Sequence, residues 1–224
     1  MELTKEQLAK LNRYLKSCGI KYYDVRSEIV DHFATKLEEK LDKNQTLNFK
    51  NEIIKIHKEF GGNGFKDFLE QKKLSVKKKF YKLTFKHLRT FFKVPKIIIS
   101  IGLFFGFVYL MNLYENPKEF FSNINVFFIF LVVQFGIRTK LSLSEDKFLI
   151  LNRSEYMFWF VYSFYFLILD PIKYFRNNAS YENTIHNYIQ IIVVVILILT
   201  YWCLEHVYYQ NKKEIKNHYP NVIV

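Results

Sequence analysis

Cysteine is nearly absent from the chain, and its two residues are poorly placed to pair. Cys18 lies in a charged N-terminal region and Cys203 in a long apolar run of the 224-residue sequence, so no disulfide framework is expected. The N-terminus carries acidic residues and lacks the apolar core of about 7 to 15 residues that marks a secretory signal peptide. We therefore expect the first apolar run to direct the chain to a membrane.

Catalytic motifs are also lacking. The sequence contains no Gly-x-Ser-x-Gly, His-Glu-x-x-His, Walker or dinucleotide-binding pattern. The apolar runs hold few polar side chains, among them Asn125 and Gln134, whereas a transporter usually needs ionisable residues near the middle of its spans. We therefore expect no enzymatic activity, no catalytic residues and no cofactor.

Acidic residues are missing from residues 72–96, which hold ten of the 33 Lys and Arg residues and directly precede an apolar run. Basic residues beside membrane spans orient the spans and attract anionic headgroups, by roughly 1 kcal/mol each near the surface. We therefore expect a basic juxtamembrane helix here, and no direct binding of nucleic acid. The residues expected to bind lipid headgroups are Lys77, Lys78, Lys79, Lys82, Lys86 and Arg89.

The same helix would have an apolar side that lies on the inner leaflet. That side would consist of Phe80, Leu83, Phe85, His87, Leu88, Phe91 and Phe92. The open alternative is that the lysines stay solvated and only fix the topology.

Helical periodicity predicts a small helical domain at residues 1–71. Thr4 and Gln7 form a capping box for a first helix that ends near Gly19, and Asp24 can cap a second helix. The second helix repeats an apolar residue every four positions, at Val25, Ile29, Phe33, Leu37 and Leu41. The third and fourth helices are expected from about residue 48 to 60 and from about residue 65 into the basic segment. Such a small core is marginal alone, and a partner protein, lipid or the loops of the membrane half could complete it.

Four apolar runs predict transmembrane helices at about residues 97–114, 120–137, 156–172 and 185–209, followed by a tail at 210–224. The first run of 18 residues would measure about 27 Å as a helix, close to the roughly 30 Å of a hydrocarbon core. Lys and Arg accumulate before the first run, after the second and after the fourth. Because basic loops stay in the cytoplasm, we expect both termini and the middle loop to be cytoplasmic, in the inner (plasma) membrane of the cell.

Glu28, Asp31 and His32 lie on one face of the predicted second helix, at a spacing that could bind a divalent cation. A complete site needs further ligands, for which His57 and Glu59 are the obvious donors. We favour a simpler interpretation, in which the acids stabilise the first turn of the helix and the histidine lies at a packing edge. No metal is therefore expected.

Gly102 and Gly106 form a Gly-x-x-x-Gly motif, which lets the backbone of another helix approach closely. The other helix could be a second span of the same chain, which we favour. It could instead be the same span of a second copy, which would give a homo-oligomer.

The N-terminal region resembles a known family. The sequence GIKYYDVRSEIVDHFATKLEEKL, followed by a helix that closes with EFGGNGFKDFLE, is similar to the HAAS-type helical domain found ahead of membrane spans in bacterial proteins associated with PadR-type transcription regulators. The resemblance covers residues 3–75. Asp24, Glu28, Asp31 and Gly61 match the pattern, whereas the proline that commonly follows that glycine is absent. The resemblance implies a signalling or regulatory role and brings no catalytic residues.

Together these features predict an all-α protein in which a small cytoplasmic helical domain is joined by a basic amphipathic helix to a four-helix transmembrane bundle. The expected function is that of a non-enzymatic signalling or regulatory adaptor. Its cytoplasmic domain would bind a protein partner, and anionic lipids of the inner leaflet would bind the basic helix. The alternative is a small transporter or channel component, which a hydrated cavity reaching Gln134 and Gln190 would favour.

Overall fold

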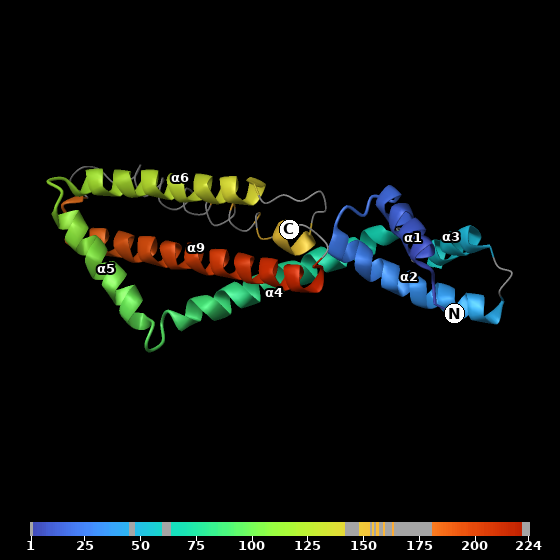
Figure 1. Ribbon diagram of the computed structural model, residues 1–224. Helices are drawn as coiled ribbons and strands as arrows, with labels where there is room; N and C mark the ends of the chain where they lie inside the picture. Colours follow the sequence, from blue (N-terminus) through green and yellow to red (C-terminus); the bar gives the residue numbers. More distant parts are fainter. Residues whose placement is uncertain are drawn as a thin grey trace. The chain divides into compact units, whose positions relative to one another are not determined.

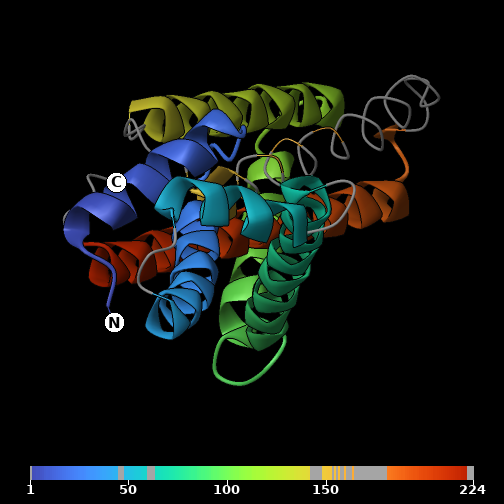
Figure 2. The same cartoon turned by 90° about the vertical axis from the view of Figure 1, so that its right-hand side faces the viewer.

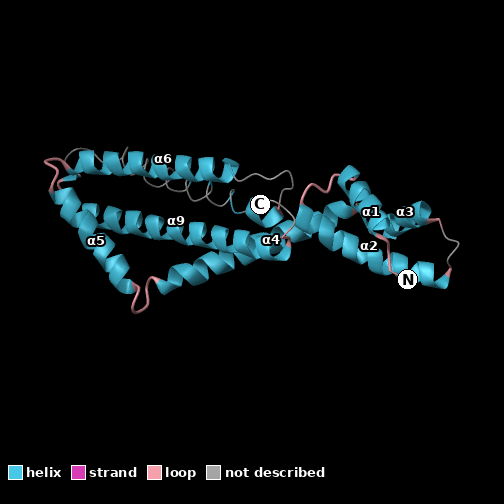
Figure 3. Cartoon of the chain, viewed as in Figure 1, coloured by secondary structure: helices cyan, strands magenta, loops and turns pink. Residues whose placement is uncertain are grey.

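The computed structural model describes residues 2–44, 48–59, 64–141, 148–152 and 181–220, together with Ser154, Tyr156, Trp159 and Ser163. This part of the chain is 85% helical and has no strands, which confirms the predicted all-α class (Figure 3). It divides into two compact units. The N-terminal unit comprises the described residues of Met1–Lys78 and Ser144–Arg153, and the apolar unit those of Lys79–Leu143 and Ser154–Pro220.

The N-terminal unit is built from three complete helices and the beginning of a fourth (Figure 1). They are α1 (Lys5–Ser17), α2 (Tyr23–Lys43), α3 (Phe49–Glu59) and the first half of α4 (Phe65–Thr90). In this unit α2 packs against both α1 and α3. The order and approximate limits of the helices are those that the sequence predicts.

The predicted capping box of α1 is confirmed. The Gln7 backbone N–H donates to Thr4 Oγ1 at 3.2 Å, and the Thr4 backbone N–H donates to Gln7 Oε1 at 2.8 Å, so two N–H groups that lack helical partners are satisfied. The helix ends at Ser17, and Gly19, two residues later, has a φ of 89°. This left-handed conformation costs glycine little because it has no Cβ atom, and the chain turns there toward α2.

The core of the N-terminal unit follows the predicted apolar stripe of α2. All five residues of the stripe are buried, at Val25, Ile29, Phe33, Leu37 and Leu41. Apolar side chains of α1 and α3 pack against the stripe, and Leu149 joins the same core with 1% of its surface exposed. A residue from the middle loop therefore completes this small core, which was one of the three sources of burial expected from the sequence.

The prediction that Asp24 caps α2 is wrong. The helix begins at Tyr23, and the residue before it, Tyr22, makes no side-chain capping bond. Asp24 lies inside the first turn, where its carboxylate accepts hydrogen bonds from the backbone N–H of Val25 and of Leu149. The carboxylate of Asp24, which was predicted to cap the helix, therefore binds Leu149, a residue far away in the sequence.

The apolar unit contains the second half of α4 and three further helices in its described part. These are α5 (Ile97–Asn112), α6 (Pro117–Leu141) and α9 (Thr184–His218). The helix α5 packs against both α6 and α9, and the shared core contains residues from all three helices. The helix α9 continues to His218 and so includes the first part of the tail expected at residues 210–224.

The helices α6 and α9 lie side by side and run in the same direction (Figures 1 and 2). Near their first residues the rings of Phe121 and Tyr181 are 6.2 Å apart, and near the other end those of Phe135 and Tyr208 are 5.5 Å apart. The chain leaves α6 at one end of this pair and enters α9 at the opposite end.

The described residues do not form the four-helix transmembrane bundle that the sequence predicts. Among the described helices, two are long and apolar enough to cross a membrane, at Pro117–Ile137 and Thr184–His218. The first predicted span corresponds to α5, which has only 16 residues, because a turn at Leu113 follows it and Pro117 already begins the next helix. At 1.5 Å per residue α5 is about 24 Å long. Of the predicted span at 156–172, all but Tyr156, Trp159 and Ser163 lies outside the described residues.

Candidate functional site

A groove lies between α1 and α3 on the N-terminal unit. Its volume is about 490 Å³. Its floor and walls are mostly apolar, whereas two lysines and an asparagine supply its polar groups. The residues that line it are Lys10, Tyr14, Asn48, Phe49, Lys50, Ile53 and Ile54. No ion pair of Lys10 or Lys50 occurs among the described residues, so both ammonium groups are available to a ligand.

Tyr14, in the wall of this groove, is held by His57. A hydrogen bond of 2.6 Å joins the tyrosine hydroxyl to Nδ1 of His57, whose ring stacks on Phe65 at 4.2 Å between centroids. Burial raises the pKa of Tyr14, with a smaller contribution from Cys18, so the phenol stays protonated at neutral pH. A Cβ atom at Gly64 would lie 3.1 Å from His57 Nε2, which makes glycine the residue that fits here. The Tyr14–His57 pair therefore holds the wall of the groove in place.

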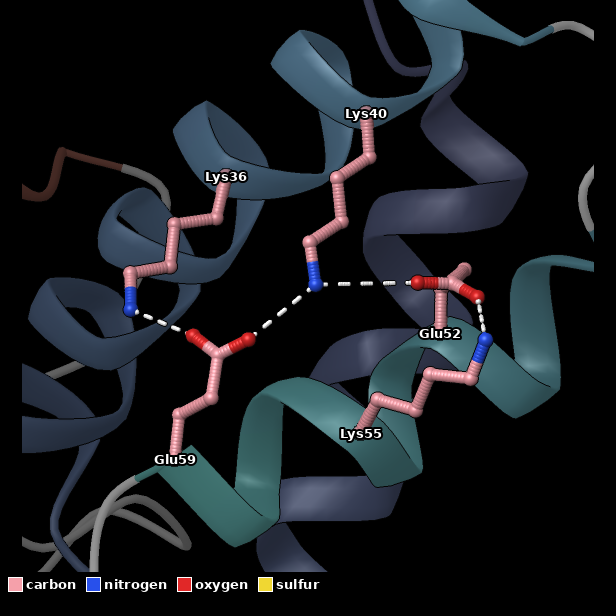
Figure 4. Close-up of polar contacts among 5 residues, drawn as sticks. All are labelled: Lys36, Lys40, Glu52, Lys55 and Glu59. Atoms are coloured by element: carbon pink, nitrogen blue, oxygen red, sulfur yellow. Dashed lines mark hydrogen bonds and ion pairs between the residues drawn. The ribbon is translucent and has the colours of Figure 1, made fainter.

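Five charged side chains join α2 to α3 beside the core (Figure 4). Lys36 and Lys40 of α2 bind Glu59 at 2.8 and 3.1 Å, while Glu52 binds Lys55 at 2.6 Å and Lys40 at 3.6 Å. The hydrogen bond from Lys55 lowers the pKa of Glu52, and those from Lys36 and Lys40 lower the pKa of Glu59. Both carboxylates are therefore ionised at neutral pH and serve to hold α3 on α2.

The structure does not gather the residues considered for metal binding. Glu28 forms an ion pair with Lys72 of α4, and both Asp31 and His32 are exposed. The two further donors are engaged elsewhere, His57 with Tyr14 and Glu59 with lysines of α2. In the described ranges, no group of three or more His, Cys, Asp and Glu side chains could hold a metal ion.

The contact between Asp24 and the middle loop is the feature that sequence reasoning missed. The Leu149 backbone N–H donates to both oxygens of the carboxylate, at 3.0 and 3.1 Å, across 125 positions of sequence. Burial raises the pKa of Asp24, and the backbone N–H groups of Leu149, Val25 and Ile150 oppose this effect. Tyr22 adds a hydrogen bond of 3.2 Å from its hydroxyl to Asn152. Residues 148–152 are thus anchored to the N-terminal unit by polar contacts as well as by Leu149.

The six basic residues expected to bind lipid headgroups all lie on α4, and all six are exposed. Lys79 approaches Glu214 of α9 at 3.9 Å, and the Arg89 guanidinium lies 4.4 Å from the centre of the Phe85 ring. The residues predicted to form one exposed apolar side of this helix do not share the same surroundings. Phe80 and Phe91 are buried, whereas Phe85 and Phe92 are exposed. The expected continuous lipid-facing side is therefore wrong, because part of it packs inside the protein.

Gly102 and Gly106 lie on an exposed side of α5. A Cβ atom added at either residue would meet no atom within 4 Å. The helix packs against its neighbours through other residues, which are Leu103, Phe104, Phe107, Val108 and Met111. The described helices therefore do not use this motif for contact with one another.

Comparisons with family models, with curated proteins and with solved structures find no match for this chain. The resemblance of residues 3–75 to the HAAS-type domain therefore stays a prediction.

Proposed function

We propose that this protein is a four-span helical protein of the inner membrane that acts as a non-enzymatic signalling or regulatory adaptor. In this proposal the N-terminal unit, the middle loop and the end of α9 face the cytoplasm. The N-terminal unit binds a protein partner there.

The apolar surface of α5, α6 and α9 is the observation that carries the membrane location. Each helix has an exposed apolar stripe in addition to the side that packs in the core. The stripes are Ile98, Ile101, Phe105 and Tyr109 of α5, Val126, Phe130, Val133 and Ile137 of α6, and Ile185, Ile189, Ile192 and Ile196 of α9. A helix of a water-soluble domain presents charged and polar residues on that side, because water does not favour large apolar patches. A lipid environment matches this surface.

The parallel packing of α6 and α9 supports four spans, with one span between α6 and α9. If α6 and α9 both cross the membrane in the same direction, the segment between them has to cross it in the opposite direction. The predicted span at 156–172 supplies this return crossing. The helix α5, at about 24 Å, is slightly shorter than a hydrocarbon core of roughly 30 Å, a mismatch that a bilayer accommodates by local thinning.

Contacts at the ends of the helices support the proposed orientation. Residues 148–152, which follow α6, belong to the core of the N-terminal unit. The Lys79–Glu214 ion pair brings the last turns of α9 to the middle of α4. These contacts support an orientation in which both ends lie on the side of the membrane that carries the basic residues, which would be the cytoplasmic side.

The groove between α1 and α3 supports the adaptor function. An apolar floor with lysines at its edge suits a peptide segment that brings apolar side chains and a carboxylate. The transporter alternative has less support, because neither Gln134 nor Gln190 lines this groove or the second groove described below.

Cysteine labelling tests the membrane topology. We expect cysteines introduced at Asn116 and at Asn178 to react with an impermeant maleimide added to intact cells, in a background that lacks Cys18 and Cys203. A cysteine at Glu39, on the N-terminal unit, should react only after lysis. Labelling of Asn178Cys only after lysis would contradict the four-span arrangement.

Capture of partner proteins tests the adaptor function. The full chain, purified in mild detergent, would serve as bait with and without Ile54→Glu, which places a charge in the groove. Leu74→Glu is the matched control, because Leu74 is another exposed apolar residue of this unit and does not line the groove. We expect a partner that the wild type and Leu74→Glu retain and Ile54→Glu loses. Equal capture by all three baits, or none, would contradict the proposed role of the groove.

A further inference from the structure

A second groove lies within the apolar unit, between α5 and α9, and has a volume of about 330 Å³. Its lining comes from the sides of the two helices that face each other, with Phe92 at one end. Residues that line it include Ile97, Ile101 and Phe104 of α5 and Ile192, Ile196 and Leu199 of α9. The one polar side chain in the lining, Ser100, already donates a hydrogen bond of 2.8 Å to the Phe91 carbonyl. The groove therefore offers nothing to a polar ligand along its length.

The length of the groove corresponds to one leaflet of a bilayer. From Ile97 to Phe105 the lining extends over nine residues of α5, or about 12 Å along the helix. One leaflet accounts for half of the hydrocarbon core, or about 15 Å. A single extended acyl chain, lying along the two helices, matches both the length and the apolar character of the groove.

Two lysines lie at one end of this groove. Lys93 and Lys96 belong to the turn between α4 and α5 and flank the lining residues Phe92 and Ile97 in sequence. The Lys96 ammonium lies 5.1 Å from the centre of the Phe91 ring, and no ion pair of either lysine occurs among the described residues. Residues 72–114 contain no acidic residue, so nothing in that segment neutralises them. This end of the groove therefore attracts an anion.

We propose that the groove between α5 and α9 binds one anionic phospholipid, with an acyl chain along Ile101 and Ile196 and the phosphate at Lys93 and Lys96. The inference rests on the proposed membrane location, which places the basic turn at the inner leaflet. It adds a defined lipid site to the general attraction of the basic helix α4 for anionic headgroups. Each lysine near the phosphate favours the anionic lipid by about fivefold.

Quenching of Trp202 by brominated lipids tests the site. Trp202 lies three residues beyond Leu199, and its ring is 5.9 Å from that of Phe91, at the lysine end of the groove. The chain has two tryptophans, so Trp159→Phe leaves Trp202 as the single tryptophan, which can be excited selectively. The full chain would be placed in phosphatidylcholine nanodiscs that contain an equal small fraction of brominated phosphatidylglycerol or of brominated phosphatidylcholine.

We expect brominated phosphatidylglycerol to quench Trp202 at a fraction at least fivefold lower than brominated phosphatidylcholine. Lys93→Gln with Lys96→Gln should remove this preference, whereas Lys118→Gln, at the start of α6, should leave it unchanged. Ile101→Phe, which fills the groove, should weaken the preference while leaving both lysines in place. Inorganic phosphate at millimolar concentration should not compete, because it has no acyl chain.

The possible failures are distinguishable. Equal quenching by the two lipids, or displacement by inorganic phosphate, overturns the lipid site and leaves the membrane location intact. A preference that survives the double lysine substitution also overturns it. If alkaline carbonate extracts the chain from cell membranes and neither lipid quenches Trp202, the membrane location fails and the lipid site fails with it.

Discussion

The two units of this protein use apolar residues in opposite ways. In the N-terminal unit the apolar stripe of α2 is buried, and the other sides of the helices carry charges such as those of the α2–α3 network. In the apolar unit α5, α6 and α9 bury one apolar side and expose another. Both units have a packed core. They differ in their outer surfaces, which are charged in the first unit and apolar in the second. This difference is what the proposed membrane location requires, with water around the first unit and lipid around the second.

Truncation of the same residue type in the two units should have very different effects. Phe33→Ala, in the core of the N-terminal unit, should lower the free energy of unfolding of this unit by about 3–5 kcal/mol, because it leaves a cavity. Phe130→Ala, on the exposed stripe of α6, should have little effect because lipid fills the space. Hydrogen exchange of backbone amides in α2 and in α6, measured on the full chain in nanodiscs, gives the two values. Equal losses would show that Phe130 packs against protein.

A charge on the exposed stripe of α6 separates lipid from water most directly. Val133→Arg should oppose membrane insertion by about 2.5–3.5 kcal/mol, whereas Val133→Leu should insert like the wild type. The inserted fraction can be measured by the modification of acceptor sites on either side of α6 during synthesis into membrane vesicles. If Val133→Arg inserts normally and makes the protein more soluble, the stripe faces water and the comparison between the units is wrong.

Asp24 tests how strongly the middle loop belongs to the N-terminal unit. Asp24→Ala leaves the Leu149 N–H without its partner and should lower the stability of the unit by about 1–3 kcal/mol. Asp31→Ala, an exposed acid of the same helix, is the matched control and should change little. Exchange of the Leu149 amide should accelerate in the first variant and not in the second. An unchanged Leu149 amide in Asp24→Ala would contradict the anchoring role.

The α2–α3 charge network should give the smallest effect, and only in acid. Because the pKa of Glu59 is lowered in the folded protein, its contribution to stability is present above the ordinary pKa of a glutamate and is lost as the pH falls through the lowered value. Glu59→Gln should therefore reduce the loss of stability between about pH 5 and pH 3. Glu39→Gln, an exposed glutamate of α2, should keep the wild-type pH dependence. Urea midpoints measured across this range provide the test, and identical slopes for all three proteins would contradict it.

Local patterns predicted the helices of the N-terminal unit well because helix signals are short-range. The capping box at Thr4 and the four-residue repeat of α2 depend on neighbours within one or two turns. Asp24 and Arg26 could not be predicted in this way. The first binds Leu149, and the second is buried against Asn12 and the carbonyl of Lys21. Their partners lie on other segments, which spacing in one helix does not reveal.

Hydropathy predicted where the apolar helices lie and gave little about how they pack. The helices α5, α6 and α9 correspond to three of the predicted spans, and their limits agree within about four residues. The exception is the end of α9, which lies beyond the predicted limit of 209. The two glycines of α5 were expected to mark a contact between spans, yet the contacts are made by larger residues such as Phe104 and Phe107. In the central parts of these helices most side chains are apolar, so the sequence pattern does not distinguish the packed side from the exposed side.

The place of Leu149 in the core of the N-terminal unit has a consequence for biosynthesis. Leu149 follows its hydrogen-bond partner Asp24 by 125 positions, and α5 and α6 are synthesised between them. At about 5–20 residues per second, a ribosome needs roughly 6–25 s to cover that distance. During this interval the first three helices have left the ribosome while their core still lacks one of its members. The core of the N-terminal unit is therefore complete only after α5 and α6 have been synthesised. Under the proposed membrane location, the final stability of this unit then reports on the assembly of the spans.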